Sequence, residues 1–365
     1  MKKPILLSLV AMIATISAGY GQTITTPRTA SPAAEVSQTI GISEVTINYS
    51  RPAVREREIW GTQLAHNGYI NLGFGTATAA PWRAGANENT TISFSHDAKV
   101  EGKEIPAGTY GLFMGLHEDG KVDVIFSKNT TSWGSYFYDQ TEDQLRVTVS
   151  STEVAHTERL TFGFIDLEKT AATCVLDWEK KRIPFKIEFA VDNLVMAKAR
   201  NDLRSTTGFS WQGPASAAQY ALQNKVALDE AETWAEQAVG MEENFNTLML
   251  QSQALAANGK DSEANAAADK ALAHPSATVN QYYQYGRQLI NQDRDDEALK
   301  VFTSLNKKWS DHWLAPHGMA RAYSAKGDFK KALKYERIAI TKCPEGSKQF
   351  LEGFIAKLEK GEDFN

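Results

Sequence analysis

The sequence predicts a multidomain α+β protein, in which an N-terminal all-β antiparallel sandwich or open barrel is followed by an all-α helical array. Three observations support this fold class. Short runs of alternating apolar and polar residues recur as far as Phe189, helical spacing replaces them after Asp192, and alanines then recur about every 34 residues. A chain of 365 residues also exceeds the roughly 100 to 200 residues of one domain, so we expect two domains.

The region 22–191 is predicted to form the β-rich domain. Its alternating runs are rich in β-branched and aromatic residues, which is typical of half-buried strands. The runs contain Val45, Ile47, Tyr49; Ile92, Phe94; Tyr110, Leu112; Val122, Val124, Phe126; Leu145, Val147, Val149; Leu160, Phe162, Phe164; and Phe185, Ile187, Phe189. Turn residues at 101–103 and 118–121 predict two hairpins.

The spacing of apolar residues is helical in the second half of the chain. Residues 192–214 are predicted to form a helix and a linker, with the Ser/Thr/Gly/Pro-rich segment Ser205–Pro214 as the domain boundary. Four repeats are expected over 215–350, and a C-terminal helix or tail over 351–365. Three rows of residues recur at the repeat period: Ala231, Ala264, Ala298, Ala332; Ala235, Ala268, Phe302, Glu336; and Ala238, Ala271, Leu305, Ala339.

The turn signals agree with this period. Gly259 and Gly327 each precede a repeat alanine by five residues, and Pro344 closes the fourth repeat. The pattern resembles tetratricopeptide repeats, 34-residue helix-turn-helix units with small residues where paired helices approach closely. The resemblance implies a groove for a protein or peptide partner. Glu336 stands where a bulky residue is usual, which predicts that the last repeat is a polar cap.

A second resemblance covers about residues 25–190. It is carried by the segments Asn48–Gly61, Pro81–Ile92, Pro106–Phe113, Trp133–Tyr138 and Asp143–Val147. These segments resemble the bacterial family known as domain of unknown function 2911, DUF2911. Members of that family are typically exported and are sometimes followed by tetratricopeptide repeats. The resemblance implies a cellular address and a domain order, but no activity.

The N-terminus has the order of a secretory signal peptide. Lys2 and Lys3 precede an apolar run, Ile5–Ile16, and small residues follow it. This run of 12 residues is shorter than the roughly 17 to 25 that a transmembrane helix needs. We therefore expect residues 1–21 to be removed by cleavage near Gln22, which gives a periplasmic or secreted product without a transmembrane segment.

The net charge and the cysteine and histidine residues exclude several classes of partner and site. Loss of the two leader lysines takes the formal net charge from −5 to −7, which argues against nucleic acid and anionic lipid as partners. Cys174 and Cys343 are the only cysteines, one in each half, and are expected to be small buried residues rather than a disulfide. The seven histidines lack metal-site spacing and no Gly-x-Ser-x-Gly motif occurs, so we expect no metal and no cofactor.

Arginines and tryptophans gather in segments of the β-rich domain that are not predicted to be strands. Guanidinium groups bind carboxylates, phosphates and sugar hydroxyls, and indole faces stack on sugar rings. The candidate ligand-binding residues are Arg51, Trp60, Trp82, Arg83, Asn87 and Glu88. The alternative is structural: Arg83 and Glu88 form an internal ion pair while Trp60 and Trp82 fill the ends of the sandwich. We favour this alternative, because arginine and tryptophan also form ordinary structural contacts.

A second aromatic cluster lies in a Ser/Thr/Asn/Gly-rich segment. It contains Trp133, Tyr136, Phe137 and Tyr138 and could form an exposed stacking platform for a ligand. Alternatively, the segment is a strand, and Trp133 and Phe137 point inward because they share a face in a period-two pattern. We favour the inward arrangement.

Two hypotheses for function follow. In the first, the protein is an exported, non-catalytic binding or scaffold protein whose repeats bind a protein or peptide. In the second, it is an enzyme or binding module in which Arg51, Arg83, Asn87 and Glu88 act on a glycan or another oxygen-rich ligand. The first is favoured because the sequence contains a recognisable interaction module and no recognisable catalytic constellation. Catalytic residues are not assigned.

Overall fold

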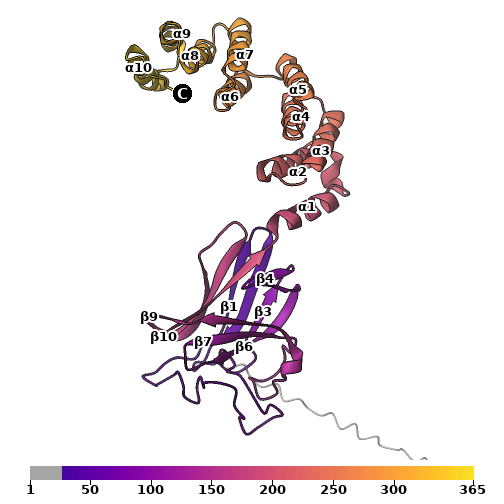
Figure 1. Cartoon of the computed structure of the whole chain (residues 1–365), viewed down its shortest axis with the longest axis vertical. Coiled ribbons are helices and arrows are strands. Elements are labelled where there is room, and N and C mark those ends of the chain that lie inside the picture. The colour runs from indigo at the N-terminus through magenta and orange to yellow at the C-terminus, as the bar shows by residue number, and fades with distance from the viewer. Residues whose placement is uncertain (1–26) are drawn as a thin grey trace, which may run out of the picture. The chain divides into compact units, whose positions relative to one another are not determined.

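The computed structural model describes residues 27–365 (Figure 1). The chain forms two compact units that divide after Val191. The predicted signal peptide lies outside the described residues. Within the described part, no helix is both long enough and apolar enough to cross a membrane.

The first unit consists of two antiparallel sheets. The six-stranded sheet has the order β1 (Ala33–Ile40), β2 (Ser43–Ser50), β3 (Thr91–Phe94), β6 (Gly108–Leu116), β7 (Lys121–Ser127), β8 (Asp143–Ser150). The four-stranded sheet has the order β5 (Lys103–Ile105), β4 (Ala98–Val100), β10 (Ala171–Phe189), β9 (Thr152–Ile165). Every predicted run of alternating residues falls in one of these strands, and both predicted hairpin turns join paired strands.

Aromatic rings join the two sheets across the core. Tyr49 of β2 meets Phe162 of β9 with ring centroids 5.0 Å apart, and Phe126 of β7 meets Phe185 of β10 at 6.0 Å. The sheets therefore pack face to face as a sandwich.

Two features of the strands were not predicted. β1 is half exposed along most of its length, so its sequence shows little apolar alternation. β10 begins at Ala171, well before the predicted run, and its register with β9 shifts on both sides of Glu179. Each shift interrupts the period-two pattern by which a strand is recognised in a sequence.

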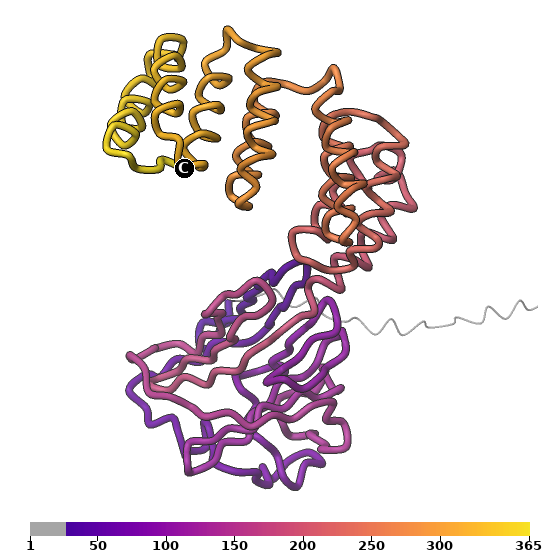
Figure 2. The backbone as a smooth tube through the Cα atoms, turned by 45° about the horizontal axis from the view of Figure 1, so that its top comes forward, coloured from indigo at the N-terminus to yellow at the C-terminus, as the bar shows by residue number. Residues whose placement is uncertain are grey.

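The second unit is helical. Its helices are α1 (Val191–Asp202), α2 (Gln212–Asn224), α3 (Leu228–Met241), α4 (Phe245–Ala257), α5 (Asp261–Ala273), α6 (Val279–Ile290), α7 (Asp295–Lys308), α8 (Leu314–Ala325), α9 (Phe329–Lys342) and α10 (Glu345–Glu359). The pairs α2/α3, α4/α5, α6/α7 and α8/α9 coincide with the four predicted repeats, and Figure 2 shows the helices of a pair running side by side. Gly259 and Gly327 both have φ +74° in the turn within a pair, a conformation that favours glycine.

Small residues allow the helices of a pair to approach closely. All twelve residues of the three predicted rows are buried. The ring of Phe302 on α7 lies against the backbones of α6 and α8: a Cβ placed on Gly286 would be 2.4 Å from this ring, and one on Gly318 would be 2.2 Å from it. The repeat register and the resemblance to tetratricopeptide repeats are confirmed.

Two expectations about this half are wrong. Ser205–Pro214 is not the boundary between the units, because it contains a 3₁₀ turn at Thr206–Phe209 and the start of α2. Met196 of α1 packs in the same core as α2 and α3, so α1 belongs to the helical unit. Glu336 is not part of a polar cap, since it is fully buried and its Oε2 lies 2.8 Å from Nδ1 of buried His317.

Candidate binding sites

Two of the predicted ligand-binding tryptophans form part of the sandwich core. Trp82 is buried, and its ring stacks on that of Trp178 with centroids 6.0 Å apart. Trp60 meets Trp82 edge to face at 5.5 Å, and Lys181 Nζ lies 4.6 Å from the Trp60 ring centroid. The ring of Trp82 is therefore unavailable for stacking on a ligand, as the structural alternative predicted.

Two of the polar candidates, Arg51 and Asn87, hydrogen-bond to neighbouring segments of the chain. Arg51 donates from Nε to the Leu160 carbonyl and from Nη2 to Thr161 Oγ1. Asn87, in the left-handed region with φ +61°, donates to the Ser31 carbonyl and to Ser50 Oγ. These bonds fix the loop that leads from β2 towards β3, so Arg51 and Asn87 have structural roles.

Glu88 pairs with a residue outside the predicted cluster. Its carboxylate accepts a hydrogen bond from Arg28, and both side chains are exposed. This hydrogen bond lowers the pKa of Glu88 below its ordinary value, whereas a general acid at neutral pH needs a raised pKa. The expected Arg83–Glu88 pair does not form. The four residues proposed for chemistry thus share no hydrogen-bonding or ring partner and make no common centre.

Arg83 lies beside Tyr136, which joins the two predicted clusters. Its guanidinium carbon is 5.1 Å from the Tyr136 ring centroid, within the range of a cation–π contact. Gly134, at φ +59°, makes room for it, because a Cβ there would lie 2.5 Å from that carbon. Among residues 27–365, no carboxylate forms a salt bridge with Arg83.

Exposed rings occur next to Tyr136 in space or in sequence. Phe74, Trp133 and Phe137 are 67%, 51% and 41% exposed, and Phe74 lies edge to face with Tyr136 at 5.5 Å. The inward arrangement that we favoured is wrong, since residues 131–139 form turns rather than a strand. Only Tyr138 of the cluster points into the core, against Phe113.

Sequence reasoning missed a hydrogen-bonded network on the outer face of β7 and β8. Asp123 accepts from Tyr69, Thr148 and His117, while Arg146 donates to Asp143 at 2.7 Å. Tyr69 joins the two groups, because its hydroxyl donates to Asp123 and accepts from Arg146. The Tyr138 hydroxyl also donates to Asp143 and accepts from Arg146. Burial raises the pKa of Asp143 above its ordinary value despite these bonds. The members come from four segments, so no local motif could have identified them.

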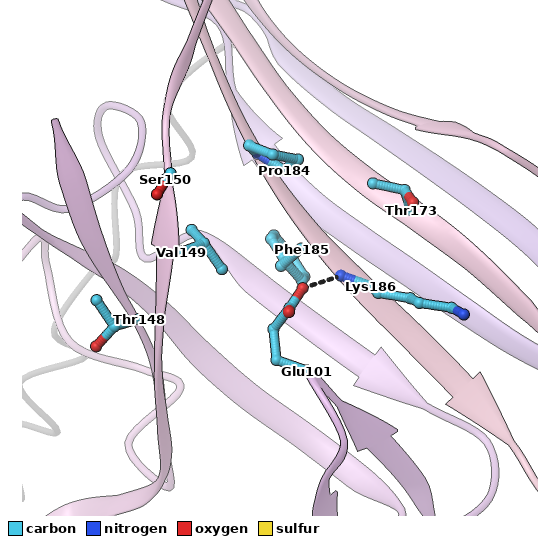
Figure 3. Close-up of a pocket in the computed structure, with 8 residues that line it drawn as sticks. All are labelled: Glu101, Thr148, Val149, Ser150, Thr173, Pro184, Phe185 and Lys186. Carbon is cyan, nitrogen blue, oxygen red and sulfur yellow. Dashed lines mark hydrogen bonds between the residues drawn. The ribbon is translucent and has the colours of Figure 1, made fainter.

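A hollow of about 370 Å³ lies where β8 approaches β10. Glu101, which lines the hollow, accepts a hydrogen bond from the backbone N–H of Lys186 at 2.6 Å (Figure 3). The amino group of Lys186 lies 3.6 Å from Glu168 and 3.4 Å from Glu188. Both charged lining residues thus already have hydrogen-bond or ion-pair partners within the unit. The residues described here also include no group of three or more His, Cys, Asp or Glu side chains that could hold a metal ion.

The helical unit has a hollow of about 250 Å³ between the first helices of its second and third repeats. Phe245 and Met249 of α4 provide apolar surface, and carboxamides from α6 surround it. The lining residues are Phe245, Met249, Asn280, Gln281, Gln284, Tyr285 and Gln288. A carboxamide both donates and accepts hydrogen bonds, as a peptide backbone does, so this hollow matches an extended chain.

Parts of the chain are similar to one protein family and to several solved structures. Residues 31–187 match the family model described as protein of unknown function (DUF2911), which confirms the resemblance of the first unit. No curated protein matches the chain. Among solved structures, the chain is similar to YrrB, described as a TPR protein with an unusual peptide-binding site, with 19% identity over 45% of this chain and 85% of that one and a TM-score of 0.30. It is also similar to MamA, with 16% identity over 42% of this chain and 83% of that one and a TM-score of 0.31. The similarity to pilF of Pseudomonas aeruginosa has 13% identity over 43% of this chain and 70% of that one, with a TM-score of 0.31.

Proposed function

We propose that this protein is an exported binding or scaffold protein whose helical repeats hold an extended segment of a protein partner. The hollow between α4 and α6 carries the proposal. Its apolar surface, from Phe245 and Met249, suits a partner side chain, and the carboxamides of Asn280, Gln284 and Gln288 suit the partner's backbone. Such a surface needs no reactive centre, because binding follows from shape and hydrogen bonding alone.

Export is proposed from the leader sequence. The test is to fractionate cells that express the full chain and to sequence the N-terminus of the mature protein. A product that begins near Gln22 and is found with the soluble envelope proteins supports the proposal. A product that retains Met1 and stays in the cytoplasm contradicts it.

Peptide display against the purified chain tests the hollow. Gln284 is exposed, so Gln284→Arg should leave the melting temperature within about 2 °C while weakening the selected peptides at least about tenfold. Ala266, an exposed residue of α5 outside the hollow, gives the matched control Ala266→Arg, which should bind as the wild type does. If both variants lose peptide binding equally, or if neither loses it, the hollow is not the peptide site.

A second candidate function belongs to the first unit. Arg83 lies over the Tyr136 ring, Phe74 contacts that ring, and Trp133 and Phe137 are exposed in the same segment as Tyr136. This group favours a glycan or another oxygen-rich ligand. A screen of soluble glycans with the wild-type chain and with Trp133→Ala tests this. Binding that Trp133→Ala abolishes supports the site, and binding that survives Trp133→Ala places the ligand elsewhere.

A further inference from the structure

Aromatic rings from α6, α8 and α10 form one column in the helical unit. Tyr283 of α6 and His317 of α8 are one 34-residue repeat apart, and Phe354 of α10 continues the series. The His317 ring centroid lies 5.5 Å from that of Tyr283 and 5.7 Å from that of Phe354. Because equivalent positions in successive repeats face the same way, the three rings line one side of the array, where Tyr283 and His317 are buried.

The segment after α10 folds back onto this column. Figure 1 shows the C-terminal end beside α8 and α10. The Phe364 ring is buried, with its centroid 4.6 Å from that of Phe354 and 6.0 Å from that of His317. Ser324 Oγ donates to Asp363 Oδ1 at 2.6 Å, and the Asn365 side chain donates to the Arg321 carbonyl at 3.1 Å. The tail is therefore held as a bound peptide is held, by one inserted ring with a polar contact on each side.

Arg321 is the charged residue of this surface. It is buried, its Nε donates to Tyr283 Oη at 2.7 Å, and its Nη1 donates to Asn365 Oδ1 at 3.2 Å. No carboxylate in the described part of the chain forms a salt bridge with it. A buried guanidinium gains most from a charged acceptor, and the neutral amide of Asn365 stands where such an acceptor would bind.

We propose that the surface formed by Tyr283, His317, Arg321, Ser324 and Phe354 is a peptide site for a partner segment in which phenylalanine is flanked by acidic residues. The tail Asp363–Asn365 occupies this site in the free protein. A tethered segment competes at an effective concentration in the millimolar range, so a partner must bind better than the tail does. A carboxylate opposite Arg321 supplies that advantage. This inference rests on the proposed function and adds a second, self-occupied surface to it.

The test uses the full chain and three fluorescently labelled peptides, Glu-Asp-Phe-Asp, Glu-Asp-Phe-Asn and Glu-Asp-Ala-Asp, followed by anisotropy. Phe364→Ala should bind the first peptide at least about tenfold tighter than the wild type does, because the competing tail is weakened. The second peptide should bind this variant more weakly than the first, and the third should not bind. Adding Arg321→Gln should remove the preference for the first peptide over the second.

A second variant keeps every ring. Asn365→Asp should strengthen the tail, which raises the melting temperature of the helical unit and weakens binding of the first peptide. If a folded Phe364→Ala variant binds no peptide, or if Asn365→Asp changes neither quantity, the tail only covers the helix ends and the proposal is wrong. Neither substitution lies in the hollow between α4 and α6, so peptide binding at that hollow would survive and the two proposals fail separately.

Discussion

The two units each contain a glutamate hydrogen-bonded to a basic side chain, and the two pairs have opposite surroundings. In the first unit, the side chains of Arg28 and Glu88 are 56% and 51% exposed. In the second unit, the side chains of His317 and Glu336 are 2% and 0% exposed. Water screens the first pair, whereas each member of the second depends on its partner for solvation. The Arg28–Glu88 pair should therefore contribute little to stability, whereas the His317–Glu336 pair is needed for the packing of the helical unit.

Removing one member of each pair tests this contrast directly. Glu336→Ala leaves His317 buried without its carboxylate and should lower the free energy of unfolding of the helical unit by about 3 to 5 kcal/mol. Glu88→Ala should change that of the β-sheet unit by less than about 1 kcal/mol. Urea unfolding followed by circular dichroism, with separate transitions for the two units, measures both. If both substitutions lowered the free energy of unfolding equally, burial would not distinguish the two pairs.

Packing in the helical unit gives a second prediction. Gly318→Ala places a methyl group 2.2 Å from the Phe302 ring and should cost about 1 to 3 kcal/mol. The matched control is Gly353→Ala in α10, where no atom lies within 4 Å of the added Cβ. This substitution should raise the free energy of unfolding by about 0.5 to 1 kcal/mol, because alanine favours a helix interior more than glycine does. If both variants were more stable than the wild type by similar amounts, the Phe302 contact would not constrain the helices.

Arg83 should contribute little to folding, although it lies next to the tryptophan core. Arg83→Ala removes one cation–π contact with Tyr136 and should lower the free energy of unfolding by about 0.5 to 1 kcal/mol. Thermal unfolding of the wild type, Arg83→Ala and Tyr136→Leu checks this, since the two variants remove the same contact. A loss of several kcal/mol for Arg83→Ala alone would make Arg83 a structural clamp and would remove it from the candidate ligand site.

The cysteines distinguish the units by reactivity rather than by stability. Burial raises the pKa of the Cys174 thiol well above its ordinary value, whereas Cys343 is partly exposed. Iodoacetamide should therefore alkylate Cys343 in the native chain and reach Cys174 only after unfolding. Mass spectrometry of the labelled peptides measures both rates. Faster labelling of Cys174 would contradict its position in the sandwich core.

The helical unit was predicted in more detail than the β-sheet unit because its contacts repeat along the sequence. The row of Ala298 identifies helix contacts by position alone, and each of its members is buried. Glu336 was misplaced because its partner His317 lies on another helix, and period analysis does not reveal which polar residues face each other.

In the β-sheet unit, neighbours in the sequence point in opposite directions. Trp82 pairs with Met114 through two backbone hydrogen bonds, so its ring faces the core while Arg83 faces outward. The sequence showed both residues in one motif and suggested one site. Tyr136 was placed with Trp133 but not with Arg83, since contacts between irregular segments leave no periodic signal.

Site-specific photocrosslinking in cells that express the protein tests most directly whether the repeats hold the partner. A photoreactive amino acid replaces Gln284 in the hollow, Ala266 on the control helix or Trp133 in the first unit, one at a time. We predict one discrete crosslinked protein from the Gln284 position and none from the other two. A product from Trp133 with none from Gln284 would contradict the account and place recognition in the β-sheet unit.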